Sequence, residues 1–246
     1  MKEFIFDEKK HVYTLDGKKL YGITNILSVI SKPALIQWAA NEAVKYIDNN
    51  RDLFTEGRGK PPKEYLVLDP EKFSVILGEA KTAHRKKKED AADAGTNIHS
   101  KIEEYIELMI TDQDGKPHSL NIENNPIQQF IDWAIKNDIK FLESEKRMYS
   151  EKLWVAGTAD FIFEKDSKVY IGDIKTYKKL WDRTPMLQCA GYGLMYEEMT
   201  NKKVDGYVII RMKDEEFEDK WGYDVEGDTE GFLSALKLFK TLENWN

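Results

Sequence analysis

The fold is decided by residues 158–176, TADFIFEKDSKVYIGDIKT, in which two apolar runs flank the polar turn KDSK. The pattern predicts two antiparallel strands that are buried on both faces and joined by a two-residue hairpin turn. That turn sets a register in which Asp160 lies directly opposite Asp173, with their Cβ atoms roughly 4.5–5.5 Å apart. Lys175 follows Asp173 by two residues, so it projects from the same face of the same strand.

Two carboxylates that face each other on an apolar hairpin repel and lose hydration, so the pair needs a compensating charge. A divalent cation bound between them supplies it, and hard cations such as Mg²⁺ and Mn²⁺ favour oxygen ligands. A lysine beside such a cation can orient or deprotonate a water molecule and offset charge in a phosphoryl-transfer transition state. The structural alternative is an Asp–Lys–Asp ion network at the end of a strand.

His99 lies at the edge of the apolar face of a predicted helix, within the stretch 95–110, GTNIHSKIEEYIELMI. The helical period turns its side chain inward, where it is either a metal ligand or a satisfied core histidine. Glu103, one turn later, lies on the same border of the face. It can be a salt-bridge partner or a group that supports the ligands.

Gln188 and Tyr192, in MLQCAGYGLMY, are four residues apart and therefore share one face of a predicted helix. That face is either an ordinary half-buried one or a support that holds water or phosphate near the lysine.

Composition is typical of a globular protein with one α/β domain or two small ones: 246 residues, 41% hydrophobic and 33% charged. A single cysteine excludes a disulfide framework, a thiolate zinc site and a four-cysteine iron–sulfur cluster. No run approaches the roughly 18 apolar residues of a membrane span, and the opening MKEFIFDEKK lacks the apolar stretch of a signal peptide. We therefore expect a cytoplasmic protein without a membrane partner.

The net charge of −7 would ordinarily count against a nucleic-acid partner, but it is unevenly distributed. Residues 212–230, the acidic segment, hold nine acidic and two basic residues, so the rest of the chain sums to zero. Residues 81–90 hold five basic and two acidic residues. Net charge therefore excludes no partner, and we expect the acidic segment either to face away from the active-site groove or to keep duplex DNA out of it.

Strand and helix patterns alternate along the chain without an internal repeat. Their order predicts an α/β fold, with a central mixed β-sheet flanked by helices, an N-terminal β meander and helical additions. The stretch 51–68 is rich in Gly, Pro and charge and is interpreted as a loop. The expected helices are 23–30, 34–50, two over 70–110 that meet near 94–96, 126–140, 184–200 and 231–245, and the expected strands after the meander are 146–157, 158–165, 167–176, 204–212 and 219–225.

Five short motifs follow one another in a fixed order over about 100 residues. They are Gly95-Thr96-x-x-His99, Glu145 in SEKRMYS, Gly157-Thr158-Ala159-Asp160, Asp173-Ile174-Lys175-Thr176 and Gln188-x-x-x-Tyr192. In order and spacing they resemble the RecB-like branch of the PD-(D/E)XK nuclease superfamily. The N-terminal stretch GITNILSVISKPALIQWAA is similar to the leader of phage-type and mitochondrial genome-maintenance exonucleases. The motif Asp173-Ile174-Lys175-Thr176 has Asp173 where many members have glutamate, and the shorter carboxylate is common in the phage-like branch.

The resemblance implies a single nuclease domain over 1–246, with an N-terminal β/helical part at 1–90 and a restriction-endonuclease-like catalytic core at 91–246. It implies one or two Mg²⁺ or Mn²⁺ ions and no iron–sulfur cluster, with Lys175 positioning the attacking water. For the acid on the first strand, Glu143 and Glu151 stay open beside Glu145. The implied residues are the catalytic Asp160, Asp173 and Lys175, the metal ligands His99, Asp160, Asp173 and Ile174 (through its main-chain carbonyl), and the supporting Glu145, Gln188 and Tyr192.

We therefore expect a metal-dependent DNA nuclease, and first an exonuclease on single-stranded or open-ended DNA, because the leader resembles end-processing members. The alternatives are a structure-specific endonuclease of the same fold and a catalytically silent DNA-binding recombination accessory. Partners besides DNA would be phage recombination or replication proteins. The candidate DNA contacts are the basic run Arg85, Lys86, Lys87 and Lys88, which can also be a solvated helix face, and Thr176, Trp181, Arg183 and Tyr65.

Overall fold

Two compact units make up the protein, seen in a computed structural model that describes residues 2–30, 33–58, 65–119, 126–176, 183–213 and 216–243. One unit joins Met1–Ile30 to Gly95–Asn246, and the other is Ser31–Ala94. The strands at the N-terminus therefore belong to the same unit as the motifs after Gly95.

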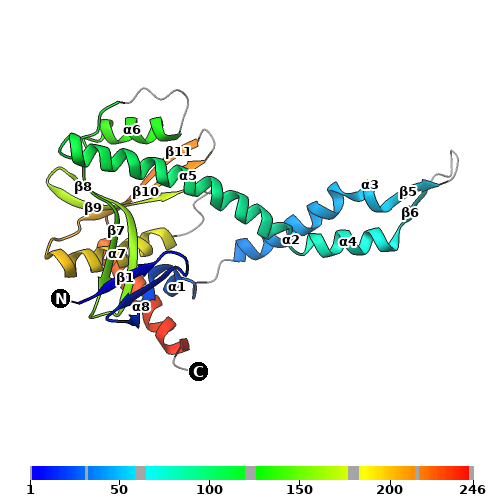
Figure 1. Ribbon diagram of the computed structural model, residues 1–246, viewed down its shortest axis with the longest axis horizontal. Helices are drawn as coiled ribbons and strands as arrows, with labels where there is room; N and C mark the ends of the chain where they lie inside the picture. Colours follow the sequence, from blue (N-terminus) through cyan, green and yellow to red (C-terminus); the bar gives the residue numbers. More distant parts are fainter. Residues whose placement is uncertain are drawn as a thin grey trace. The chain divides into compact units, whose positions relative to one another are not determined.

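The larger unit is built on a six-stranded mixed sheet (Figure 1). Its strands are β4 (Tyr21–Gly22), β7 (Lys140–Ser150), β8 (Val155–Lys165), β9 (Lys168–Lys175), β10 (Gly206–Lys213) and β11 (Glu216–Gly222). They follow the order β11-β10-β9-β8-β4, with β7 paired to β8. β9 and β10 are parallel, as are β4 and β8, whereas the other pairs are antiparallel. The predicted mixed α/β sheet is confirmed.

Helices cover both faces of this sheet, and each face has its own buried apolar cluster. They are α1 (Ile23–Leu27), α5 (Ala83–Asp112), α6 (Pro126–Lys136), α7 (Thr184–Thr200) and α8 (Val225–Glu243). On one face α1, α7 and α8 share a cluster with Ile171 and Ile209. On the other, α6 and the C-terminal part of α5 share a cluster with Phe161 and Phe163. In the described parts of the chain, no helix combines the length and apolar character needed to cross a membrane.

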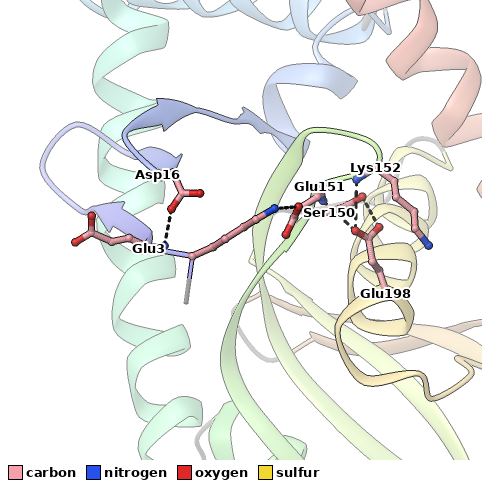
Figure 2. A network of polar contacts seen from close by, with 7 residues as sticks. Glu3, Asp16, Ser150, Glu151, Lys152 and Glu198 are labelled. Carbon is pink, nitrogen blue, oxygen red and sulfur yellow. Dashed lines mark hydrogen bonds and ion pairs between the residues drawn. The ribbon is translucent and has the colours of Figure 1, made fainter.

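The predicted N-terminal meander forms a three-stranded antiparallel sheet of β1 (Phe4–Asp7), β2 (Val12–Leu15) and β3 (Lys18–Lys19). Tyr13 and Leu15 bury their side chains beside Ala156 of β8. Figure 2 shows polar contacts at this end of the unit, where the Glu198 carboxylate on α7 accepts hydrogen bonds from the Ser150 hydroxyl at 2.7 Å and the Glu151 amide at 3.0 Å. These bonds fix the turn between β7 and β8 to α7.

The unit Ser31–Ala94 is mostly helical. It contains α2 (Pro33–Asn49), α3 (Arg51–Phe54), β5 (Thr55–Arg58), β6 (Tyr65–Leu68), α4 (Pro70–Ala80) and the first part of α5. The loop predicted for 51–68 is wrong, because β5 and β6 pair antiparallel. Thr, Tyr and Val favour strands, and that preference outweighs the charge and glycine content of the stretch. The Gly- and Pro-containing residues 59–64 lie outside the described residues.

Several predicted boundaries differ from the observed ones for local reasons. The break expected near 94–96 is wrong, because α5 is continuous there and the interruption falls at 81–82. The strand expected over 146–157 is divided by a turn in which Trp154 takes a left-handed φ of 61°. The helix expected over 126–140 ends at Lys136, since Asp138 also has a positive φ, 50°. The last helix begins at Val225, earlier than the expected residue 231.

Candidate active site

The hairpin β8–β9 has the predicted register, which runs from Lys165 opposite Lys168 to Phe161 opposite Gly172. The ladder ends one pair before Asp160 and Asp173. There the Asp160 Oδ2 atom accepts a hydrogen bond from the Ile174 main-chain N–H at 2.6 Å. The Asp160 side chain thus accepts the hydrogen bond of a main-chain amide on β9, and this bond fixes the Asp160 carboxylate at the end of the ladder.

Three potential metal ligands converge beside this point. His99 on α5, Glu145 on β7 and Asp160 on β8 each offer one ligand atom, and these atoms all lie within 4.8 Å of one another. The His99 Nδ1 atom is 3.7 Å from Asp160 Oδ2. The structure therefore brings two of the predicted ligands, His99 and Asp160, together with the glutamate that the sequence had placed only as a supporting residue.

Glu145 is the first-strand acid that faces this cluster. Glu143 instead pairs with Lys146 at 2.9 Å, and Glu151 pairs with Lys2. Glu145 has a left-handed φ of 42° in the middle of β7. Such a conformation is uncommon for a residue with a side chain and costs on the order of 1–3 kcal/mol, so the surrounding sheet must impose it. Strain of this kind is concentrated at functional sites.

The electrostatics of the cluster favour a bound cation. Burial, followed by the negative charges of Asp160 and Glu103, raises the pKa of Glu145 to about 8, and Arg147 opposes the rise. Two carboxylates and an imidazole within 4.8 Å make a donor set that suits a divalent ion with a preference for oxygen and nitrogen. The residues present therefore fit the expected Mg²⁺ or Mn²⁺.

Asp173 and Lys175 form a buried ion pair next to the cluster. The side chain of Asp173 is 2% exposed, and its Oδ2 atom lies 2.6 Å from the Lys175 Nζ atom. Burial raises the pKa of Asp173, and the adjacent Lys175 charge opposes that rise. The charges of Asp160 and His99 also act on the pKa of Asp173, so the pair and the metal-ligand cluster belong to one electrostatic site.

The α7 residues Gln188 and Tyr192 extend the pair as the shared helix face predicted. Lys175 Nζ donates to Gln188 Oε1 at 3.2 Å, and Gln188 Nε2 donates to the Tyr192 hydroxyl oxygen at 2.7 Å. The Tyr192 ring lies over Gly157, where an added Cβ would stand 2.7 Å from a ring carbon. Lys175 is thereby oriented from both sides, by a carboxylate on its own strand and by an amide on the following helix.

Gly95 sets how closely α5 approaches the sheet, a role that the sequence did not reveal. A Cβ at this position would lie 2.6 Å from the Thr176 hydroxyl oxygen, just after the end of β9. His99 follows Gly95 by about one helical turn. The close contact therefore controls the position of the histidine in the cluster.

The N-terminal sheet also reaches the edge of the site. The Tyr13 hydroxyl lies 2.8 Å from Thr158 Oγ1, and Arg147 donates to Glu8 at 2.7 Å. The Arg147 guanidinium stacks over the Phe6 ring, 5.1 Å from its centroid. No local sequence signal could have linked these residues, because well over 100 positions separate the partners.

The predicted DNA contacts are divided between the two units. Arg85, Lys86, Lys87 and Lys88 belong to the other unit, where Lys87 pairs with the buried Glu42. Arg183 forms ion pairs with Asp224 at 3.0 Å and Asp228 at 2.5 Å, which balance its charge. Thr176 contacts Gly95 as described above. Trp181 and the side chain of Tyr65 lie outside the described residues.

Part of the acidic segment 212–230, the strand β11, belongs to the same sheet as the site, whereas the segment was expected to face away from the groove or to keep duplex DNA out of it. This strand is separated from β9 only by β10. Its Glu216 and Glu218 reach back to pair with Arg211, which lies opposite Lys175 in the parallel ladder. The sequence could not show this, because a strand's place in a sheet depends on long-range pairing.

Known proteins add little to this geometry. No family model matches the chain, and no curated protein matches it either. Among solved structures 19 chains match, one of which is described as the crystal structure of SSO0001. It is 11% identical, and the alignment covers 88% of this chain and 75% of the other with a TM-score of 0.35. Similarity at this level carries no argument about fold or activity.

Proposed function

We propose that the protein is a Mg²⁺- or Mn²⁺-dependent deoxyribonuclease that hydrolyses phosphodiester bonds, most simply an exonuclease on single-stranded or open-ended DNA. The observation that carries the proposal is the convergence of His99, Glu145 and Asp160 within 4.8 Å, beside a lysine held by Asp173 and Gln188. The resemblance adds Asp173 and the main-chain carbonyl of Ile174 to the ligands. It also implies that the sheet is the core of a restriction-endonuclease-like fold and that the protein is cytoplasmic.

The residues of the chain divide the work of hydrolysis. A divalent cation held by this set would polarise a phosphate oxygen and lower the pKa of a bound water. Lys175 contributes a positive charge and N–H donors for the attacking water and for the charge that develops on the phosphate. Asp173 pairs with that ammonium and orients it, and Gln188 limits its rotation. Catalysis would then come from positioning and electrostatics, without a covalent intermediate.

Asp160→Asn tests the proposal, with Asp166→Asn as the matched control. Asp166 lies in the exposed turn of the same hairpin, so the two variants make the same change in charge and size. Wild type and Asp166→Asn should cut labelled DNA with Mn²⁺ and not with EDTA, and should melt at a higher temperature with Mn²⁺. Asp160→Asn should lose the cutting and most of the melting shift. Cutting in EDTA, or equal cutting by Asp160→Asn, would overturn the proposal.

The same protein preparations distinguish an exonuclease from an endonuclease. An exonuclease degrades linear single-stranded DNA and leaves circular single-stranded DNA intact. Cutting of the circle at a similar rate would instead assign a structure-specific endonuclease.

A further inference from the structure

Arg211 on β10 is a buried cation covered by two acids of the acidic segment. Its guanidinium donates through Nε to Glu218 at 2.8 Å and lies within 2.9 Å of Glu216 through Nη1. The Arg211 side chain is 9% exposed, whereas the Glu216 and Glu218 side chains are 70% and 50% exposed. The acids therefore form the solvent side of this contact, and the arginine lies beneath them.

This cation stands beside the proposed catalytic lysine. Arg211 is opposite Lys175 in the parallel ladder and opposite Glu218 in the antiparallel one. Residues opposite each other project from the same face, so Lys175, Arg211 and Glu218 form one row across three strands. Neighbouring strands are about 4.8 Å apart, so the row places Arg211 next to the lysine and Glu218 about 10 Å from it.

The row also lies where α/β sheets bind ligands. β9 and β10 are parallel, α7 connects them, and Lys175 and Arg211 lie near their carboxyl ends. Ligands of such sheets bind outside the carboxyl ends of the strands. An extended DNA strand with one phosphate at Lys175 would pass over the adjacent strand, on which Arg211 lies opposite that lysine.

The two acids can be displaced by a phosphate. Ion pairs with exposed partners contribute little, because water and salt screen them. An arginine–phosphate contact can instead be bidentate and charge-assisted, which makes it the stronger of the two. A phosphate can therefore replace Glu216 and Glu218 on Arg211, but only against the cost of separating them.

We propose that Arg211 binds a backbone phosphate next to the one at Lys175, and that Glu216 and Glu218 compete with the DNA for it. This inference rests on the proposed nuclease function. The acidic edge strand then sets the affinity for DNA: it keeps Arg211 oriented in the free protein and weakens the binding of a DNA strand that reaches the row.

Binding of a fluorescein-labelled oligothymidylate, followed by anisotropy in Ca²⁺, tests the competition. The variant Glu216→Gln/Glu218→Gln should lower the Kd about 3- to 10-fold, as loss of two weak competing pairs allows. The matched control is Glu226→Gln/Glu230→Gln, which removes the same charge from exposed positions on α8 in the same acidic segment. The control should change the Kd less than twofold. An equal gain in the control would reduce the effect to net charge and overturn the inference.

Arg211 itself is tested in both backgrounds. Arg211→Gln should weaken binding and lower the salt slope of log Kd by about one, as loss of one phosphate contact requires. In the triple variant Arg211→Gln/Glu216→Gln/Glu218→Gln, which leaves no charge unpaired at the site, the gain from the two glutamines should vanish. A gain that persists without Arg211 would overturn the inference. If the wild type cuts DNA with Mn²⁺ but the double variant binds like wild type, this inference fails alone; if the wild type neither binds nor cuts DNA, the proposed function fails as well.

Discussion

Because Gly95 lies against Thr176, adding a single methyl group at Gly95 should change the position of His99. In Gly95→Ala the new Cβ would lie 2.6 Å from Thr176 Oγ1, whereas ordinary contacts begin at 3.4 Å. The shortfall of about 0.8 Å must be met by movement of α5, of Thr176 or of both. Metal–ligand distances tolerate only about ±0.2 Å, so a helix shift of this size one turn from His99 should disturb the cluster.

The energetic balance of Gly95→Ala gives its expected size. Overpacking costs about 1–3 kcal/mol, and replacing glycine by alanine inside a helix returns about 0.5–1 kcal/mol. We expect a net loss of about 0–2.5 kcal/mol in stability, measured by thermal unfolding in EDTA. Mn²⁺ affinity should fall about tenfold or more, measured by calorimetric titration, because loss of support for a ligand typically costs this much.

Two second-site changes at Thr176 separate the steric cause from others. Thr176→Ala removes the hydroxyl and leaves the Thr176 Cβ at 3.6 Å, an ordinary contact, so Gly95→Ala/Thr176→Ala should recover the Mn²⁺ affinity. Thr176→Val puts a methyl group where the hydroxyl was, so it should not rescue. Wild-type affinity in Gly95→Ala, or equal rescue by valine and alanine, would refute the reasoning.

Two further predictions concern stability. Because the ion pair with Lys87 lowers the pKa of Glu42, Glu42 contributes stability that is present above its ordinary value of 4.5 and is lost as the pH falls below it. Thermal unfolding should therefore show Glu42→Gln less stable than wild type at neutral pH, with the difference closing in acid; a constant difference would contradict this. The left-handed φ of Glu145 predicts that Glu145→Gly is more stable than Glu145→Ala by about 1 kcal/mol in EDTA, since glycine takes this conformation without strain. Equal melting temperatures would mean that the strand relaxes.

The local part of the site was predictable from the sequence, and the long-range part was not. The turn KDSK fixes the β8–β9 register, because a two-residue hairpin leaves no freedom in pairing. The pairing of Lys175 with Gln188 depends on one crossover helix and could also be anticipated. Which of Glu143, Glu145 and Glu151 faces the cluster depends on the backbone φ of Glu145 within β7, and the residue types do not predict that angle.

The same distinction explains what the fold added. Gly95 was interpreted as a helix boundary, because glycine disfavours helix interiors. The structure shows instead that its missing side chain makes room for Thr176, a contact between residues 81 positions apart. Arg211 gave no signal at all, since its importance depends on the strand order that puts it between Lys175 and the acids of β11.

The buried pair of Asp173 and Lys175 determines how the catalytic lysine should be tested. Lys175→Met keeps an apolar stem but leaves a carboxylate at 2% exposure without its partner, which costs on the order of 3 kcal/mol. Loss of activity in this variant could then reflect misfolding or an altered metal site. Metal binding resolves the question, because removing a cation beside Glu145, Asp160 and Asp173 makes the site more negative. Lys175→Met should therefore melt earlier than wild type in EDTA, show a larger rise in melting temperature with Mn²⁺, and fail to cut DNA. Lys168→Met, the same change at the exposed start of β9, should match wild type in all three measurements. If Lys175→Met loses both the Mn²⁺-induced rise in melting temperature and the cutting of DNA, then Lys175 maintains the site rather than acting on the substrate.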